Sequence, residues 1–198
     1  PFNSITGLSY FVVAYMLWKL LKTRKDRPLL LNFMIVITLL IGAGSITFHT
    51  SARMWGAIFD SAPIALFAGV YMYAMLRHLL GLKAYEVLIL LAAFVAGNFA
   101  FKILVIRAAD GYISILPTLG FIALVTFYMW LRQNPSRKIF LLVSLVSFVA
   151  VYFRILDFAI CDDFPIGTHF VWHILMAVVI YNLNAELIRR YPAKITPR

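Results

Sequence analysis

The chain consists of long apolar stretches separated by short polar breaks. Seven apolar segments of 17 to 23 residues can be counted, at 5–21, 28–48, 55–76, 84–106, 112–131, 138–158 and 168–188. A helix of roughly 18 or more apolar residues covers the ~30 Å hydrocarbon core of a bilayer, and only a helix satisfies its own backbone polar groups there at such lengths. The pattern therefore predicts an all-α fold, an integral membrane bundle of seven transmembrane helices. Because the connections are short, we expect a single domain over residues 1–198.

Composition agrees with lipid as the solvent for most of the chain. Hydrophobic residues make up 63% of it and charged residues 13%, whereas soluble domains have about 45–50% and about 25%. Cys161 is the only cysteine, so no intramolecular disulfide can form. The chain begins at Pro1 and enters its first apolar segment within a few residues. We expect that an N-terminal segment is missing, and a cleaved signal peptide is one form it could take.

Positive charge is unevenly distributed between the two ends of the predicted bundle. The chain has 18 Lys and Arg against 8 Asp and Glu, a net charge of +10. Fourteen of the basic residues fall on one side: Lys19, Lys22, Arg24, Lys25, Arg27, Arg77, Lys83, Arg132, Arg137, Lys138, Arg189, Arg190, Lys194 and Arg198. Four fall on the other: Arg53, Lys102, Arg107 and Arg154. By the positive-inside rule the N-terminus is predicted outside and the C-terminus cytoplasmic, and basic residues placed between apolar runs argue against nucleic-acid binding.

Five polar side chains lie in the outer halves of the predicted spans, where ionisable groups are costly and usually functional. They are Ser45, His49, Asp60, His169 and His173. Residues four apart on a helix share one face, so His169 and His173 can turn a ring nitrogen each toward one ion, and His49 can supply a third from another helix. Three protein ligands and a water form the open arrangement of catalytic zinc. A single histidine in a span is more often a hydrogen-bonded core residue, and we interpret His78, beside Arg77 in a basic turn, as solvated.

Asp60 and Ser45 are the predicted catalytic side chains. A carboxylate such as Asp60 can take the proton of an attacking water and return it to the nitrogen of an amide leaving group. The alternative role for Asp60 is to hydrogen-bond a ligand histidine and so fix its tautomer. Ser45, one turn before His49, could orient the water or stabilise an oxyanion, and its alternative role is a hydrogen bond to the carbonyl four residues earlier.

Two further pairs of residues have structural interpretations. Arg154 and Asp157, three residues apart near the outer end of their segment, are interpreted as an ion pair that closes the bundle, with binding of a lipid head group as the alternative. Gly42 and Gly44 are interpreted as sites of close helix packing, since the sequence around them has no P-loop context.

Two stretches of sequence carry a resemblance to a known family. They are Gly-Ala-Gly-Ser-Ile-Thr-Phe-His at 42–49, followed by Asp60 eleven residues later, and Gly-Thr-His-Phe-Val-Trp-His at 167–173. Together they resemble the alkaline ceramidases, members of the CREST superfamily of membrane hydrolases, which also contains the adiponectin receptors. The likeness spans the second to the seventh segment. It implies a seven-helix zinc amidase that cleaves the N-acyl bond of ceramide to a sphingoid base and a fatty acid.

The resemblance carries over residue by residue. His49, His169 and His173 match the zinc ligands of the family, and Ser45 and Asp60 match its active-site serine and aspartate. The Trp172–His173 pair, and Asp157 followed by Cys161, are more similar to the ceramidase branch than to the receptor branch.

The ends of the chain differ from the animal ceramidases. Those enzymes bind calcium through an acidic N-terminal segment, of which only residues 1–4 could remain, with Asn3 as the one possible ligand, so a calcium ion is possible only in the missing segment. The short loops resemble compact bacterial members. This implies a bacterial inner membrane rather than ER or Golgi, with the active site toward the extracytoplasmic face.

These observations predict a zinc-dependent membrane amidase that acts on ceramide or a related lipid amide. The partner is a membrane-embedded, ceramide-like lipid, and no obligate protein partner is indicated. The alternatives are a zinc hydrolase for a different lipid amide or ester, and a lipid receptor like the adiponectin receptors. An ion transporter is disfavoured because residues 29–40 and 178–180 leave almost no polar path through the inner half.

Overall fold

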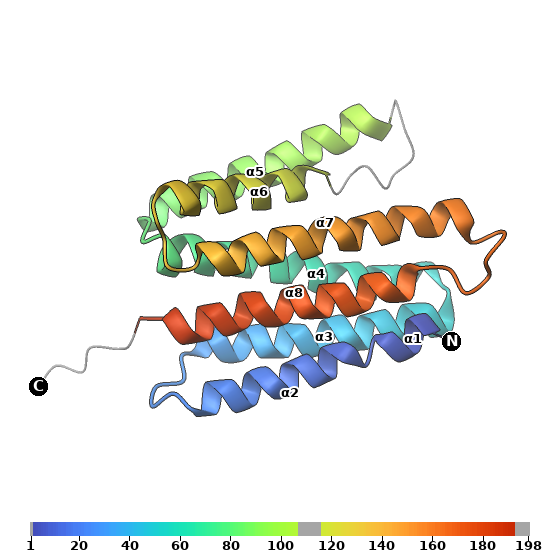
Figure 1. Ribbon diagram of the computed structural model, residues 1–198, viewed down its shortest axis with the longest axis horizontal. Coiled ribbons are helices and arrows are strands. Elements are labelled where there is room, and N and C mark those ends of the chain that lie inside the picture. The colour runs from blue at the N-terminus through green and yellow to red at the C-terminus, as the bar shows by residue number, and fades with distance from the viewer. Residues whose placement is uncertain (1, 107–115, 193–198) are drawn as a thin grey trace, which may run out of the picture.

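The computed structural model describes residues 2–106 and 116–192 (Figure 1). Pro1, Arg107, Lys194 and Arg198, which entered the predictions on the N-terminal tail and on charge, lie outside these residues, as do the first four residues of the predicted segment 112–131. The side chain of Lys102 is also not described.

The described chain is all-helical, as predicted. Its elements are α1 (Phe2–Thr6), α2 (Ser9–Lys22), α3 (Leu29–Ser51), α4 (Met54–Ala74), the π-helical turn η1 (Met75–Leu79), α5 (Ala84–Ile106), α6 (Leu116–Leu131), α7 (Arg137–Ile160) and α8 (His169–Arg190). The first predicted span is divided by the break between α1 and α2, and the others agree with the helices to within a few residues.

Six helical stretches in the described ranges are long and apolar enough to cross a membrane. They are Phe2–Lys22, Leu29–Ser51, Met54–Leu79, Ala84–Phe101, Arg137–Ile160 and His169–Arg190. Helix α6 is equally apolar but has 16 described residues. The chain thus has the dimensions and composition of an integral membrane protein, and a seventh span at 112–131 stays a prediction.

Helices α1 and α2 run in the same direction, and from α2 to α8 each helix runs opposite to the one before it, so that α1 begins at one end of the bundle and α8 finishes at the other (Figure 1). The most extensive contacts join α3 to α4 and α7 to α8, and α2 packs against both α3 and α8. Helices α5 and α6 lie at the rim, beyond α4 and α7 (Figure 1). Most of the buried core residues belong to α2, α3, α4 and α8, which we call the central helices.

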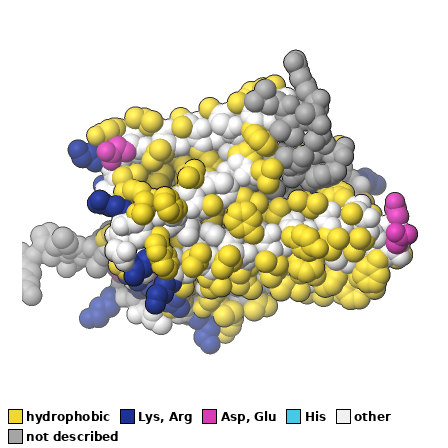
Figure 2. All heavy atoms as spheres, turned by 45° about the horizontal axis from the view of Figure 1, so that its top comes forward, with side chains coloured by type: hydrophobic (Ala, Val, Ile, Leu, Met, Phe, Trp, Pro, Cys, Tyr) yellow, Lys and Arg dark blue, Asp and Glu magenta, His cyan; other side chains and the backbone are white. Residues whose placement is uncertain are grey.

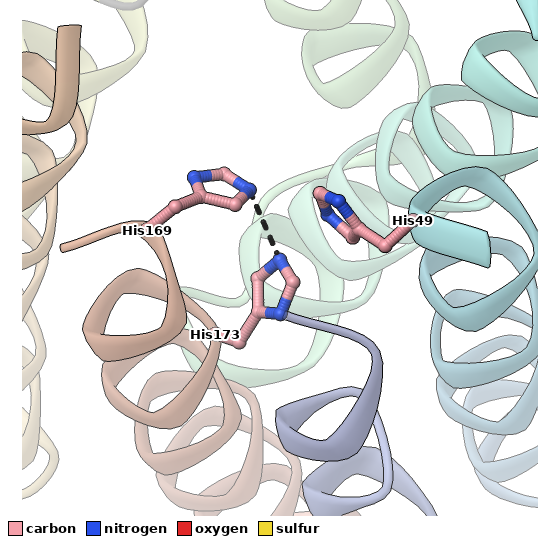
Figure 3. Close-up of side chains that lie close together, drawn as sticks. All are labelled: His49, His169 and His173. Atoms are coloured by element: carbon pink, nitrogen blue, oxygen red, sulfur yellow. Dashed lines mark hydrogen bonds between the residues drawn. The ribbon is translucent and has the colours of Figure 1, made fainter. Parts of the chain in front are cut away.

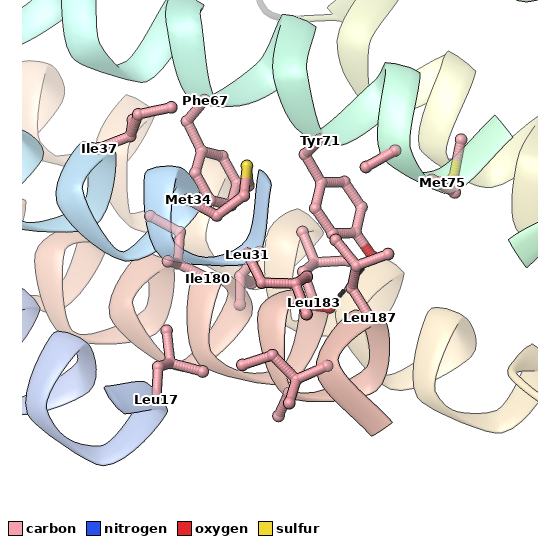
Figure 4. Packing of buried hydrophobic residues seen from close by; sticks show 14 of the residues in the cluster. Leu17, Leu31, Met34, Ile37, Phe67, Tyr71, Met75, Ile180, Leu183 and Leu187 are labelled. Carbon is pink, nitrogen blue, oxygen red and sulfur yellow. Dashed lines mark hydrogen bonds between the residues drawn. The ribbon is translucent and has the colours of Figure 1, made fainter. Parts of the chain in front are cut away.

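The core lies between these central helices (Figure 4). Leu17, Leu31, Met34 and Leu187 are fully buried in it. Large apolar side chains also cover the outside of the bundle, as expected where lipid replaces water, while Lys and Arg gather mainly at one end of the face in view (Figure 2). We call this the basic end and the opposite one, where α3 finishes and α8 begins, the histidine end.

Helices α3 and α4 form a hairpin with an unusually tight connection at the histidine end. Only Ala52 and Arg53 separate them, and Ala52 has a left-handed backbone with φ 50°. Its N–H donates to the carbonyl of Phe48 at 2.8 Å, which closes the last turn of α3. The chain therefore reverses at once and brings α4 back along α3.

Candidate metal centre

The three predicted ligand histidines converge at the histidine end (Figure 3). His49 comes from the last turns of α3, and His169 and His173 from the first turns of α8. Their ring centroids lie 5.0 Å (His49–His169), 4.9 Å (His49–His173) and 4.6 Å (His169–His173) apart. One ligand nitrogen from each lies within 4.8 Å of the others. The predicted proximity of these side chains is confirmed.

The arrangement of the ring nitrogens fits a metal ion. Nε2 of His169 and Nε2 of His173 face each other at 3.1 Å, close to the separation of about 3.3 Å that two bonds of ~2.0–2.1 Å at a tetrahedral angle would give. Nε2 of His49 is buried and has no hydrogen-bond partner in the described chain. A buried polar atom without a partner is costly, and a metal ion bound by all three rings would satisfy it. The donor set suits several transition metals, so the geometry defines a candidate metal site rather than the identity of its ion.

His169 is placed by a carboxylate from the neighbouring helix. Asp157 of α7 accepts hydrogen bonds through Oδ1 from the backbone N–H of Thr168 (2.6 Å) and of His169 (2.9 Å). It therefore caps α8, whose first N–H groups have no partner within the helix. Gly167, at φ 63°, leaves room for this contact, because a Cβ there would collide with the Asp157 carboxylate.

The predicted ion pair between Arg154 and Asp157 is wrong. The ion pairs of the described residues are Arg24–Asp26 and Arg190–Glu186, and the Asp157 carboxylate is occupied at the start of α8. Arg154 turns instead to the histidines: its NH1 lies 3.1 Å from Nδ1 of His169. The spacing of three residues predicted two neighbours on one helix, whereas the two side chains reach different partners.

His173 is positioned by the N-terminal helix. Its Nδ1 lies 3.0 Å from the carbonyl oxygen of Asn3 and 3.1 Å from Oγ1 of Thr6. A hydrogen on Nδ1, donated to the carbonyl, leaves the Nε2 lone pair for a metal. The sequence linked Asn3 only to a possible calcium site and did not single out Thr6, and no spacing signals a contact between residues about 170 positions apart.

Ser45 lies one turn before His49 on α3, and Asp60 lies against α3 beside Gly44; neither hydrogen-bonds to a histidine among the described residues. Ser45 is 2% exposed, one turn before His49, and its Oγ has no hydrogen-bond partner among the described residues. Asp60 is half-buried in the second turn of α4. A Cβ on Gly44 would lie 3.1 Å from the Asp60 Cα and would collide with the Phe59 carbonyl, so Gly44 permits the contact that brings Asp60 against α3. The interpretation of Gly44 as a packing residue agrees with this geometry, and the catalytic roles of Ser45 and Asp60 stay predictions.

The chain matches no known family model, and no characterised protein sequence matches it. The fold and the site define it as an integral membrane protein with a buried three-histidine candidate metal site at one end of its helical bundle.

Proposed function

We propose that the protein is a zinc-dependent membrane amidase that hydrolyses the N-acyl bond of ceramide or a related lipid amide. The observation that carries this proposal is the unpartnered Nε2 of His49 beside the facing Nε2 atoms of His169 and His173. The motifs around these residues, which resemble those of the alkaline ceramidases, supply the reaction type and the substrate class.

His49, His169 and His173 would hold the zinc ion through their neutral ring nitrogens, a set of three protein ligands typical of catalytic zinc. When bound, zinc polarises a carbonyl group and lowers the pKa of a water molecule toward about 7. Because all three ligands are neutral, the site retains the full charge of the ion for this purpose.

Asp60 and Ser45 carry the proton and hydrogen-bond steps of the proposed reaction. Asp60 accepts a proton from the attacking water as a C–O bond forms at the carbonyl carbon. It then donates that proton to the nitrogen as the C–N bond breaks, which releases an amine and a fatty acid. Ser45 Oγ, buried and without a partner in the described chain, donates a hydrogen bond to the carbonyl oxygen, which gains negative charge on attack.

The membrane supplies the substrate in this proposal. A lipid enters sideways between helices until its amide reaches the histidine end, and water enters from the nearby surface. We place the histidine end at the extracytoplasmic face, since Lys and Arg gather mainly at the opposite end (Figure 2). A hydrolase for another lipid amide or ester would use the same residues and is the alternative to be tested.

The test combines the metal content of detergent-purified protein with release of fatty acid from a panel of ceramides. We expect about one zinc ion per chain and hydrolysis of at least one ceramide. Bound zinc without ceramide hydrolysis would favour the alternative, a zinc hydrolase for another lipid amide or ester. A folded protein without zinc would contradict the proposal.

Two variants separate catalysis from metal binding. Asp60→Asn should retain zinc and lose roughly 10²–10⁴-fold in turnover, the usual contribution of general acid–base catalysis. Ser45→Ala should also retain zinc and lose less turnover. Normal hydrolysis by Asp60→Asn would exclude Asp60 as the proton carrier.

A further inference from the structure

Arg154 is a cation at the edge of the histidine cluster. It lies near the end of α7, its NH1 is 3.1 Å from Nδ1 of His169, and its guanidinium carbon is 4.7 Å from the centroid of the Phe158 ring. Its charge also acts on His49 and Asp60. Of the charged side chains that the structure describes, it is the one within hydrogen-bond distance of the ring of a candidate ligand.

The positive charge of Arg154 has no carboxylate at ion-pair distance in the described ranges. Asp157 caps α8, and both Asp157 and Asp60 interact with Arg154 only at longer range. An arginine within a membrane span is costly, and such residues usually pair or bind a ligand. One hydrogen bond to a neutral ring leaves most of the five N–H donors of the guanidinium unused.

Metal binding at His169 would free Arg154 further. An arginine only donates, so a neutral His169 that accepts from it through Nδ1 carries its hydrogen on Nε2. His169 therefore cannot accept from Arg154 at Nδ1 and bind a metal through Nε2 at the same time. When Nε2 binds the ion, the guanidinium must leave Nδ1 and find another acceptor next to the reacting group.

We propose that this acceptor is the carboxylate of a fatty acid, bound by Arg154 at the edge of the metal site. The planar fork of a guanidinium matches a carboxylate with two parallel hydrogen bonds. The identity of the acid as a product rests on the proposed amidase activity: hydrolysis replaces the C–N bond by a C–O bond and leaves a carboxylate and an amine. The cationic amine is repelled by Arg154 and attracted by Asp60, so Arg154 selects the acyl side of the scissile bond.

The test measures binding rather than turnover. The affinity of purified, zinc-loaded protein for a long-chain fatty acid is compared with that for the fatty alcohol of equal length, at a pH where the acid is ionised. We expect the acid to bind about ten- to a hundredfold more tightly than the alcohol, the usual effect of a charged hydrogen-bond partner. The metal is present in every sample, so the part of the preference that is lost with Arg154 is assigned to this residue and not to the metal.

Three variants assign the preference to a residue. Arg154→Gln should abolish it while leaving the affinity for the alcohol unchanged, and Arg154→Lys, which keeps the charge, should retain part of it. Arg53→Gln removes a positive charge from the exposed start of α4 at the same end of the bundle and should change nothing. An equal preference in Arg154→Gln and in the unmodified protein, or no preference in the unmodified protein, overturns the proposal. If Arg154→Gln does not fold, the decision rests on Arg154→Lys. Lysine keeps the positive charge but lacks the planar fork of donors, so this variant must bind the acid more weakly than the unmodified protein does.

An alkyl phosphate of the same chain length tests whether Arg154 recognises a lipid phosphate instead of a carboxylate. If it binds more tightly than the acid, and only when Arg154 is present, the residue recognises lipid phosphate and the carboxylate assignment is overturned. Because no turnover is measured, a chain that fails to cleave ceramide but shows the Arg154-dependent preference would refute the amidase and leave the carboxylate site standing.

Discussion

The buried polar side chains of α3 and α8 differ in their hydrogen bonding between the basic end and the histidine end. Toward the basic end, Thr38 donates to the carbonyl of Met34 at 2.9 Å, Asn184 donates to that of Ile180 at 3.0 Å, and Glu186 pairs with Arg190. Toward the histidine end, Ser45 Oγ and His49 Nε2 are buried and have no hydrogen-bond partner within the part of the chain that the structure describes.

This difference separates polar groups that stabilise the fold from those available to a ligand. At the basic end each of the three groups named above finds its partner within one turn of its own helix, so its burial costs little. At the histidine end Ser45 Oγ and His49 Nε2 are buried without a partner among the described residues, which is costly unless something else binds there. Four experiments test this contrast.

The largest effect is expected for His173→Ala. It removes one of three neutral nitrogen ligands, so the protein should lose both its bound metal and its hydrolytic activity. His78→Ala is the matched control, because His78 lies at the basic end against the Tyr191 ring, at a centroid distance of 4.3 Å. Elemental analysis measures the bound metal per chain in both variants. An equal loss of metal from the two would show that metal binding does not depend specifically on the histidine end.

Gly44→Ala should destabilise the fold next to the site. Its Cβ would collide with the Phe59 carbonyl of α4, so α3 and α4 must separate, at a cost of about 1–3 kcal/mol. Gly69→Ala in α4 is the control, since a Cβ there has nothing within 4 Å. Thermal unfolding in detergent should show a lower midpoint for Gly44→Ala alone, and an unchanged midpoint would mean that the two helices do not need this contact.

Asp157→Ala should weaken the metal site without removing a ligand. It removes the carboxylate that caps α8, which should lower the free energy of unfolding by about 0.5–2 kcal/mol. The backbone of His169 then loses the group that holds it in place, so metal affinity should fall about tenfold. Asp162→Ala, in the exposed connection that follows α7, should leave both unchanged. Metal titration and thermal unfolding measure the two effects, and full metal affinity in Asp157→Ala would show that the cap does not position His169.

The smallest effect is expected at the basic end from Tyr71→Phe. It removes the hydrogen bond from the Tyr71 hydroxyl to the Leu183 carbonyl, which is 3.2 Å long, and should lower the free energy of unfolding by about 0.5–1.5 kcal/mol. The metal content should not change. A loss of metal from this variant would show that the two ends are coupled.

The helices themselves were largely predictable from the apolar runs. The predicted segment 84–106 agrees with α5, and 168–188 differs from α8 by one or two residues at each end, because span length and charged ends delimit a membrane helix. The end of α3 was less predictable: it extends to Ser51, where the left-handed Ala52 stops it. The break between α1 and α2 lies within an apolar run and was not predicted.

The sequence by itself determined the all-helical membrane character and the candidate ligand set, because apolar length and the spacing of four residues between His169 and His173 are local properties of a chain. Only the tertiary structure decided that Asp157 caps α8, that Arg154 contacts His169 and that Asn3 orients His173. Each of these contacts joins side chains or backbone groups from different helices. Which groups meet across a bundle depends on how the helices pack, and no periodicity within one helix contains that information.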